Sequence, residues 1–302
     1  MVRMDRFLNS RTGLSITMTL ARMTPPWFGY GLARLVSGAI AARRRSDLVR
    51  AVRANQWVVS GEQATPQELD RAVWGVINHS ARAIYELYHH AQDLENAGSL
   101  FSMDPSFKAI LERPHFGQRG LVVAGLHMSG FDLAFQWACL KWVNPLALTL
   151  SDPQDGRRME FELRQKIAPN LMPGSVGGLR QAIRYLDQGG IVATGIDRPV
   201  PGVHPTLRFF NRPASLPSLH VFLALKARVP VVLAASRSKE TGGYHLYASA
   251  PIEMDPHPDR NTELQRNGEK ILKEAEKMIR QDPQQWLVPI PVWPEALEQT
   301  PR

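Results

Sequence analysis

The sequence has 302 residues, of which 44% are hydrophobic, with one cysteine and a formal net charge of +8. That is enough apolar material for a sizeable core, and the single cysteine, Cys139, excludes an intrachain disulfide framework and fits a reducing, cytoplasmic compartment best. The longest apolar stretch, residues 12–33, is interrupted by an arginine and a proline pair, so neither a spanning helix nor a cleavable signal peptide is expected.

The positive charge is concentrated near the N-terminus. Residues 1–60 contain ten arginines and two aspartates, so they carry the whole net charge and the remaining residues balance to zero. A basic segment on a neutral body suits an anionic surface, either a membrane leaflet or a nucleic acid. The ten arginines are Arg3, Arg6, Arg11, Arg22, Arg34, Arg43, Arg44, Arg45, Arg50 and Arg53.

The first hundred residues are predicted to be helical. The prolines at positions 25 and 26 can open a helix that continues through apolar residues to Ile40 and ends in three arginines. Ser46 can cap the next helix. The stretch Thr65-Pro66-Gln67-Glu68 is a capping box, and the helix that it starts is expected to end near Gln92.

The helix after the proline pair combines aromatic residues with a basic end. Trp27, Phe28 and Tyr30 with their apolar neighbours are typical of a helix that lies in a membrane interface, with arginines toward anionic headgroups. The alternative is a helix packed on the body with its arginines in water. Both descriptions can hold for different parts of the segment.

From Gly120 onward, short β-rich runs alternate with amphipathic helices. The alternation predicts an α/β fold with a mostly parallel central sheet flanked by helices. No Gly/Ser-rich linker separates the parts, so residues 1–302 are expected to form a single domain, with residues 1–100 as a helical segment and 101–302 as the α/β body. The runs are LVVAGL, FDLAFQWACLKW, LALTL, MEFELRQKI, VGGLRQAIRYL, GIVATGI, SLHVFLALKA, VPVVLAAS and YHLYASA, followed by a helix over about 262–280 and the tail DPQQWLVPIPVWPE.

The segment HMSGFD directly follows the first of these strands. His127 is therefore expected at the carboxyl end of a strand, where open α/β sheets bind ligands. Asp132 falls in the first turn of the next helix, from which it could hold one imidazole nitrogen and leave the other free as a base. The structural alternative is a capping box, with Ser129 as the N-cap and Asp132 reaching back to the Ser129 amide.

The same segment resembles the motif of a histidine, four residues and an acidic residue in the lysophospholipid acyltransferase superfamily. The chain resembles in particular the branch that contains the lipid A late acyltransferases and the mycobacterial phosphatidylinositol mannoside acyltransferase. The likeness covers nearly the whole chain, including GIVATGIDRP and IRQDPQQWLVPIPVW. It implies that His127 is a general base with Asp132 as its partner, although this branch often has Glu where the sequence has Asp132, which shortens the side chain by one methylene.

The resemblance also implies roles for residues outside this segment. Asp197 and Arg198 stand where the branch has an acidic residue followed by Arg or Gln. They follow the strand GIVATGI, whose end should border the same crevice as His127, and there Asp197 would position the acceptor hydroxyl or hold an arginine; the alternative is an ordinary turn. Arg164 stands where the branch has an arginine that holds the oxyanion or the donor phosphates, and a solvated helix face is the alternative. Within HMSGFD itself, and independently of the resemblance, the amides of Ser129 and Gly130 lie at a helix N-terminus and could stabilise the oxyanion.

Together these features predict an O-acyltransferase on the cytoplasmic face of the membrane, bound peripherally to an anionic surface. The donor would be acyl-CoA or an acyl group on acyl carrier protein, the acceptor a glycolipid or lysophospholipid, and no further cofactor is expected. No metal is expected either, because adjacent His89 and His90 point in different directions from their helix. No nucleic acid is expected, because the basic residues are interleaved with aliphatic ones and no nucleic-acid module is recognised. A non-catalytic anionic-lipid or nucleic-acid binding protein and a thioesterase are the alternatives. The acceptor, the acyl length, the choice of donor and the oligomeric state are left open.

Overall fold

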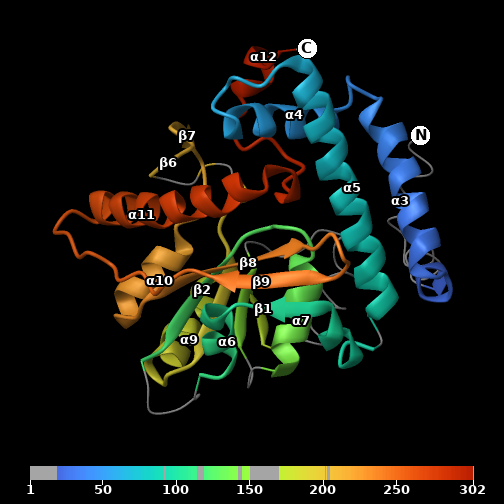
Figure 1. Ribbon diagram of the computed structural model, residues 1–302. Helices are drawn as coiled ribbons and strands as arrows, with labels where there is room; N and C mark the ends of the chain where they lie inside the picture. The colour runs from blue at the N-terminus through green and yellow to red at the C-terminus, as the bar shows by residue number, and fades with distance from the viewer. Residues whose placement is uncertain are drawn as a thin grey trace.

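The computed structural model describes residues 19–91, 93–113, 119–141, 145–149, 170–200, 202 and 205–301. Within these ranges a seven-stranded sheet forms the centre of the molecule (Figure 1). The α-helices are α3 (Pro26–Ala41), α4 (Asp47–Val59), α5 (Pro66–His90), α6 (Pro105–Leu111), α7 (Phe131–Lys141), α9 (Val176–Asp187), α10 (Leu219–Ala227), α11 (Arg260–Gln281) and α12 (Ala296–Gln299). The strands are β1 (Phe101–Met103), β2 (Leu121–Gly125), β3 (Leu146–Thr149), β4 (Leu171–Pro173), β5 (Ile191–Gly195), β6 (Leu207–Phe209), β7 (Arg212–Ala214), β8 (Val231–Ser238) and β9 (Tyr244–Ala248).

The sheet is mostly parallel, as the alternation of strands and helices predicted. Its strand order is β1-β9-β8-β2-β5-β3-β4, and β8 with β9 is the antiparallel pair within it. The central strands are nearly continuous apolar runs, which is what a strand covered on both faces requires. A separate hairpin joins β6 and β7.

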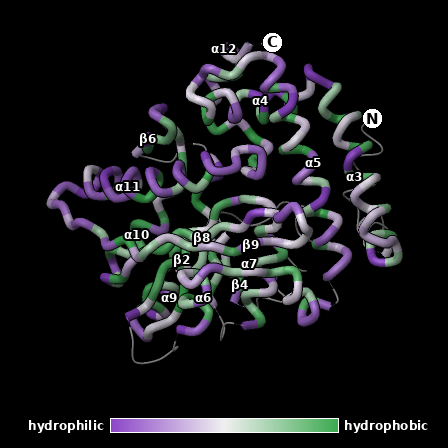
Figure 2. Tube along the Cα trace, viewed as in Figure 1, coloured by the Kyte–Doolittle hydropathy of each residue, from purple (hydrophilic) through white to green (hydrophobic). Residues whose placement is uncertain are grey.

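Helices cover both faces of the sheet, because successive side chains of a strand point to opposite sides. On β2, Leu121 and Val123 belong to the apolar cluster that contains α6 and α7. Val122 and Ala124 belong to the cluster that contains α9, α10 and α11. The central strands are accordingly coloured as largely hydrophobic in Figure 2, whereas α11 shows a hydrophilic outer side. The expected α/β architecture is confirmed.

The helical N-terminal segment is also confirmed, and its caps are those expected. The Ser46 hydroxyl caps α4, and Thr65 and Glu68 form the reciprocal bonds of a capping box on α5. Helix α5 ends at His90, two residues before the predicted end. Helix α3 lies along α5 at one side of the molecule (Figure 1). None of the described helices is long and apolar enough to cross a bilayer.

Some elements have no counterpart in the sequence predictions. The short strands β1 and β4, the β6–β7 hairpin and helix α6 were not expected. The helix predicted over MEFELRQKI falls in residues 151–169 and lies outside the described residues.

The tail after α11 is packed into the body. The turn η2 (Pro283–Gln285) follows α11, and Trp286 then forms an isolated antiparallel bridge with Met128. Trp286 and Trp293 are both fully buried and join Phe209 and Phe210 in an aromatic cluster. The tail thereby reaches the segment that carries His127.

Candidate active site

His127 and Asp197 occupy equivalent positions on neighbouring strands. His127 lies two residues beyond the end of β2, and Asp197 lies two residues beyond the end of β5. The two strands are parallel and in register, with Gly125 opposite Gly195. The side chains that follow the strand ends therefore meet at the carboxyl edge of the sheet, where α/β sheets place their ligands.

Asp197 accepts three hydrogen bonds. Its Oδ1 accepts from Nδ1 of His127 at 2.5 Å, and its Oδ2 accepts from the backbone amide of His127 at 2.9 Å and from the indole N–H of Trp286 at 2.8 Å. Because an ionised carboxylate can only accept, the imidazole carries its proton on Nδ1. Nε2 is then the nitrogen with a free lone pair, which is the arrangement of an oriented general base.

The environment of Asp197 keeps its carboxyl group ionised. The side chain is fully buried, and burial by itself raises a carboxyl pKa. The charge of His127 and the hydrogen bonds from His127 and Trp286 outweigh that effect, so the pKa of Asp197 lies below its ordinary value. A buried anion is therefore available at neutral pH to stabilise a protonated imidazole.

Close neighbours fix the His127 ring. A side chain at Gly195 would place a Cβ 2.8 Å from Cε1 of His127, so the close approach of β5 requires glycine there. The Phe131 ring packs edge-on at 4.6 Å between centroids. The guanidinium of Arg198 in turn lies over Phe131, 5.8 Å from its centroid. The Phe131 ring thus lies next to both His127 and Arg198.

The predicted partner Asp132 lies in the first turn of α7, after Gly130, which adopts a φ of +74°. The prediction gave one ring nitrogen of His127 to Asp132, and in the structure Nδ1 is held by Asp197. The alternative capping box lacks its defining bond, because the buried Ser129 hydroxyl has no hydrogen-bond partner among the described residues. A catalytic role of Asp132 stays a prediction.

A buried glutamate connects the segment after His127 to the N-terminal helices. Glu86 of α5 accepts a hydrogen bond of 2.6 Å from the hydroxyl of Tyr30 on α3 and another from the hydroxyl of Tyr244 on β9. The Tyr244 ring occupies the space that a side chain at Gly130 would need. Burial, followed by the proximity of Glu86, raises the pKa of Tyr244 well above its ordinary value, so the phenol remains a donor. No sequence pattern indicated this contact.

The other sequence candidates do not form a second centre. Arg164 lies outside the described residues. His220 on α10, which was not a sequence candidate, is fully buried, and burial lowers its pKa to about 3, so it is a neutral core residue. Within the described ranges no group of three His, Cys, Asp or Glu residues is arranged to hold a metal ion.

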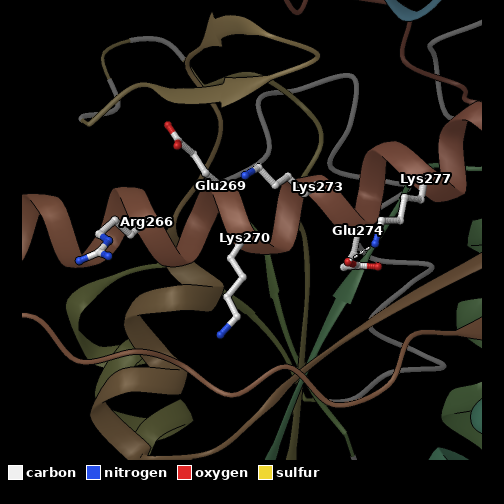
Figure 3. Close-up of a pocket in the computed structure, with 6 residues that line it drawn as sticks. All are labelled: Arg266, Glu269, Lys270, Lys273, Glu274 and Lys277. Carbon is white, nitrogen blue, oxygen red and sulfur yellow. Dashed lines mark hydrogen bonds and ion pairs between the residues drawn. The ribbon is translucent and has the colours of Figure 1, made fainter.

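A surface hollow beside α11 is separate from this site. Its lining is entirely charged and comes from one helix (Figure 3), and it includes none of the residues discussed above. Two of its four basic side chains are engaged in ion pairs: Lys270 with Asp255, and Lys277 with Glu274. The lining residues are Arg266, Glu269, Lys270, Lys273, Glu274 and Lys277.

Comparison with known proteins places this site within a family. Residues 108–293, more than half of the chain, match the family described as bacterial lipid A biosynthesis acyltransferase, and the match includes His127, Asp197 and Trp286. No curated protein sequence gave a match. One similar solved structure is the 1-acyl-sn-glycerophosphate acyltransferase PlsC from Thermotoga maritima, with 14% identity over 85% of this chain and 98% of that chain and a TM-score of 0.38. The chain thus belongs to the bacterial lipid A biosynthesis acyltransferase family.

Proposed function

We propose that this acyltransferase moves a fatty acyl group from a thioester, on coenzyme A or acyl carrier protein, to a hydroxyl of a membrane glycolipid or lysophospholipid. The observation that carries the proposal is the hydrogen bond between His127 and a buried, ionised Asp197 inside the region that matches the family. His127 and Asp197 form a base and its orienting group, but neither of these two residues is the nucleophile that attacks the thioester. An acceptor hydroxyl supplies the nucleophile.

The reaction then needs two proton transfers at one nitrogen. Nε2 of His127 takes the proton of the acceptor hydroxyl as its oxygen attacks the thioester carbonyl. The tetrahedral intermediate collapses, the carbon–sulfur bond breaks, and Nε2 returns the proton to the leaving thiolate. Asp197 stays ionised throughout and stabilises the imidazolium between the two transfers.

The Gly130 amide is a candidate for stabilising the oxyanion of that intermediate. The Ser129 amide follows Met128, which forms the antiparallel bridge with Trp286 of the tail. The Gly130 amide comes next, immediately before the N-terminus of α7. Positive partial charge at a helix N-terminus suits a developing oxyanion. Arg198 and, by family resemblance, Arg164 are further candidates for binding the donor.

A peripheral location at the cytoplasmic face of the membrane is part of the proposal, and the outer face of α3 supports it. The inner face buries small residues, Gly29, Ala33 and Ser37, against the body. The outer face leaves large apolar side chains in water, which soluble proteins rarely gather in one patch. These side chains, on α3 and just before it, are Leu20, Met23, Trp27, Phe28, Leu32, Leu35 and Val36.

Part of the N-terminal charge is available to anionic headgroups. Arg34, Arg43 and Arg45 are exposed, and no ion pair of theirs occurs among the described residues. Arg44 and Arg53 instead pair with Asp70 on α5, so Arg53 holds α4 to α5 and Arg44 holds the turn before α4 to the same helix. The charge that favours an anionic surface is therefore smaller than the composition alone suggests, and it lies next to the apolar face.

The decisive experiment compares His127→Ala with His257→Ala, which changes a histidine in the loop before α11. Each purified protein is incubated with long-chain acyl-CoA, or with acyl carrier protein loaded with the same acyl group, and with vesicles of the lipids of the host membrane. Thiol release and acylated lipid, identified by mass spectrometry, are both measured. We expect His127→Ala to lose about 10³-fold or more of the transfer rate while remaining folded.

The two readouts separate the alternatives. Thiol release that does not need a lipid acceptor and yields free fatty acid would make the protein a thioesterase. Full transfer activity in His127→Ala would refute the general-base assignment. Binding to vesicles or nucleic acid without release of thiol from either donor would favour a non-catalytic binding protein.

A further inference from the structure

The C-terminal tail supplies one of the three hydrogen bonds that hold Asp197. The indole Nε1 of Trp286 donates to Oδ2 of Asp197 at 2.8 Å, and the amide of Leu287 donates to the carbonyl of His127 at 2.7 Å. Both members of the catalytic pair are thus tied to the same short segment. We propose that Trp286 is a positioning residue, whose indole N–H locks the Asp197 carboxylate in the orientation that keeps the His127 proton on Nδ1.

The two carboxylate oxygens have different tasks. Oδ1 faces the imidazole alone, whereas Oδ2 accepts two N–H groups. One of those groups is the backbone amide of His127, which moves with the histidine. The indole is the independent anchor, because it belongs to a segment about ninety residues further along the chain. Rotation of the carboxylate about its Cβ–Cγ bond would break the bonds at both oxygens.

The position of the indole is itself well determined. Trp286 is 1% exposed and contacts the rings of Phe209, Phe210 and Trp293. The side chain of the preceding Gln285 accepts a hydrogen bond of 2.6 Å from the amide of Ser238 on β8. A rigid donor of this kind adds little reorganisation when the imidazole gains and loses its proton.

Trp293 provides a matched control. It is as deeply buried as Trp286, and it lies in the same cluster at 6.2 Å between ring centroids. Its indole Nε1, however, has no acceptor within the described part of the chain. Trp293→Phe therefore removes the same atoms from the same aromatic environment without removing a hydrogen bond.

The experiment compares Trp286→Phe with Trp293→Phe in the full-length protein. The first readout is the steady-state kinetics of acyl transfer, and this readout rests on the proposed function. Trp286→Phe should lower kcat about tenfold and leave KM within twofold of its original value. Trp293→Phe should leave kcat within twofold of its original value. A second readout does not need activity: ¹⁵N NMR of the His127 ring, assigned with His127→Ala, reports which nitrogen carries the proton. Trp286→Phe should convert a single Nδ1–H form into a mixture of tautomers.

A second substitution covers the case in which Trp286→Phe does not fold. Incorporation of 3-benzothienylalanine at position 286 replaces the N–H by sulfur and keeps the shape of the ring system, so it should reproduce both effects. Equal losses of kcat in the Trp286 and Trp293 variants, or an unchanged His127 tautomer with the benzothienyl side chain, would overturn the positioning role. Failure of the proposed function has a different signature: the unsubstituted protein would transfer no acyl group to lipid, or His127→Ala would keep full transfer activity.

Discussion

The two carboxylate oxygens of Asp197 accept hydrogen bonds from different donors, and this difference makes the isosteric substitution Asp197→Asn informative. The backbone amide of His127 and the Trp286 indole both donate to the Oδ2 position. An asparagine must therefore turn its carbonyl oxygen toward these donors and its NH₂ group toward Nδ1. That orientation forces the proton onto Nε2 and removes the lone pair that the base needs.

We accordingly expect Asp197→Asn to lower kcat by about 10³- to 10⁴-fold near neutral pH, with the fold retained. Steady-state transfer assays and near-UV circular dichroism would measure the two properties. A loss of less than tenfold would contradict the orienting role of Asp197. Asp104→Asn, at the N-cap of α6, is a control that changes a carboxylate elsewhere in the same fold.

The residues of the site differ in how far the sequence could predict them. His127 was expected at a strand end, and Asp197 was expected at the border of the same crevice, because both follow strands with a clear apolar pattern. The hydrogen bond between them depends on the register of β2 with β5, which one sequence does not specify. Trp286 lies in a tail without periodicity, where two tryptophans among prolines and aliphatic residues indicate burial but no partner.

At the scale of elements, helix α3 has two faces with different chemistry. We expect Trp27→Glu combined with Leu35→Glu to weaken binding to anionic vesicles by tenfold or more, because both side chains are 74% exposed and each would contribute about 1.5–3 kcal/mol on entering an apolar phase. Co-sedimentation with vesicles at a fixed ionic strength would measure the change. Val176→Glu on α9, at a residue that is 69% exposed, is the matched control.

Equal vesicle binding by these proteins would show that α3 is not the membrane contact. Because the substituted side chains face solvent, the double variant should keep its thermal stability. If vesicle binding were equal, the role of α3 would be limited to packing its inner face on the body, where Tyr30 donates a hydrogen bond to Glu86.

The elements that the sequence predicted are those with strong local signals. The capping box of α5, the serine cap of α4 and the apolar runs of β2, β5 and β8 all appear where expected. Strands β1 and β4 contain only three residues each, too few for a period-2 pattern to be recognised. Each forms by pairing with the free edge of a neighbouring strand, β1 with β9 and β4 with β3. That edge is a property of the folded sheet and cannot be recognised in the three-residue segment itself.

At the scale of the whole molecule, helix α4 closes onto the C-terminal tail. The buried Asn55 side chain donates to the carbonyls of Val288 and Ile290 and accepts from the amide of Val292, at 3.1, 2.9 and 3.0 Å. One side chain thus satisfies three backbone groups of a segment that has no regular partner. Leaving such groups unpaired costs about 1–3 kcal/mol each.

Asn55→Ala should lower the free energy of unfolding by about 2–4 kcal/mol, measured by urea denaturation. Gln56→Ala is the adjacent control. Gln56 is also buried, but it makes a single bond of 2.9 Å, to the carbonyl of Pro283, so its loss should be about 1–2 kcal/mol. Similar values for both variants would mean that the Asn55 contacts do not hold the tail specifically.

The position of Trp286 in the chain also has a consequence for biosynthesis. Chains emerge from the ribosome with their N-terminal elements first. The apolar face of α3 is therefore exposed early, and β2 and β5 follow, but the indole that anchors Asp197 arrives only after every strand of the sheet has been made. A nascent chain can therefore reach a surface before the Trp286 indole binds Asp197, and under the proposed mechanism the base would be oriented only once the segment that carries Trp286 has been made.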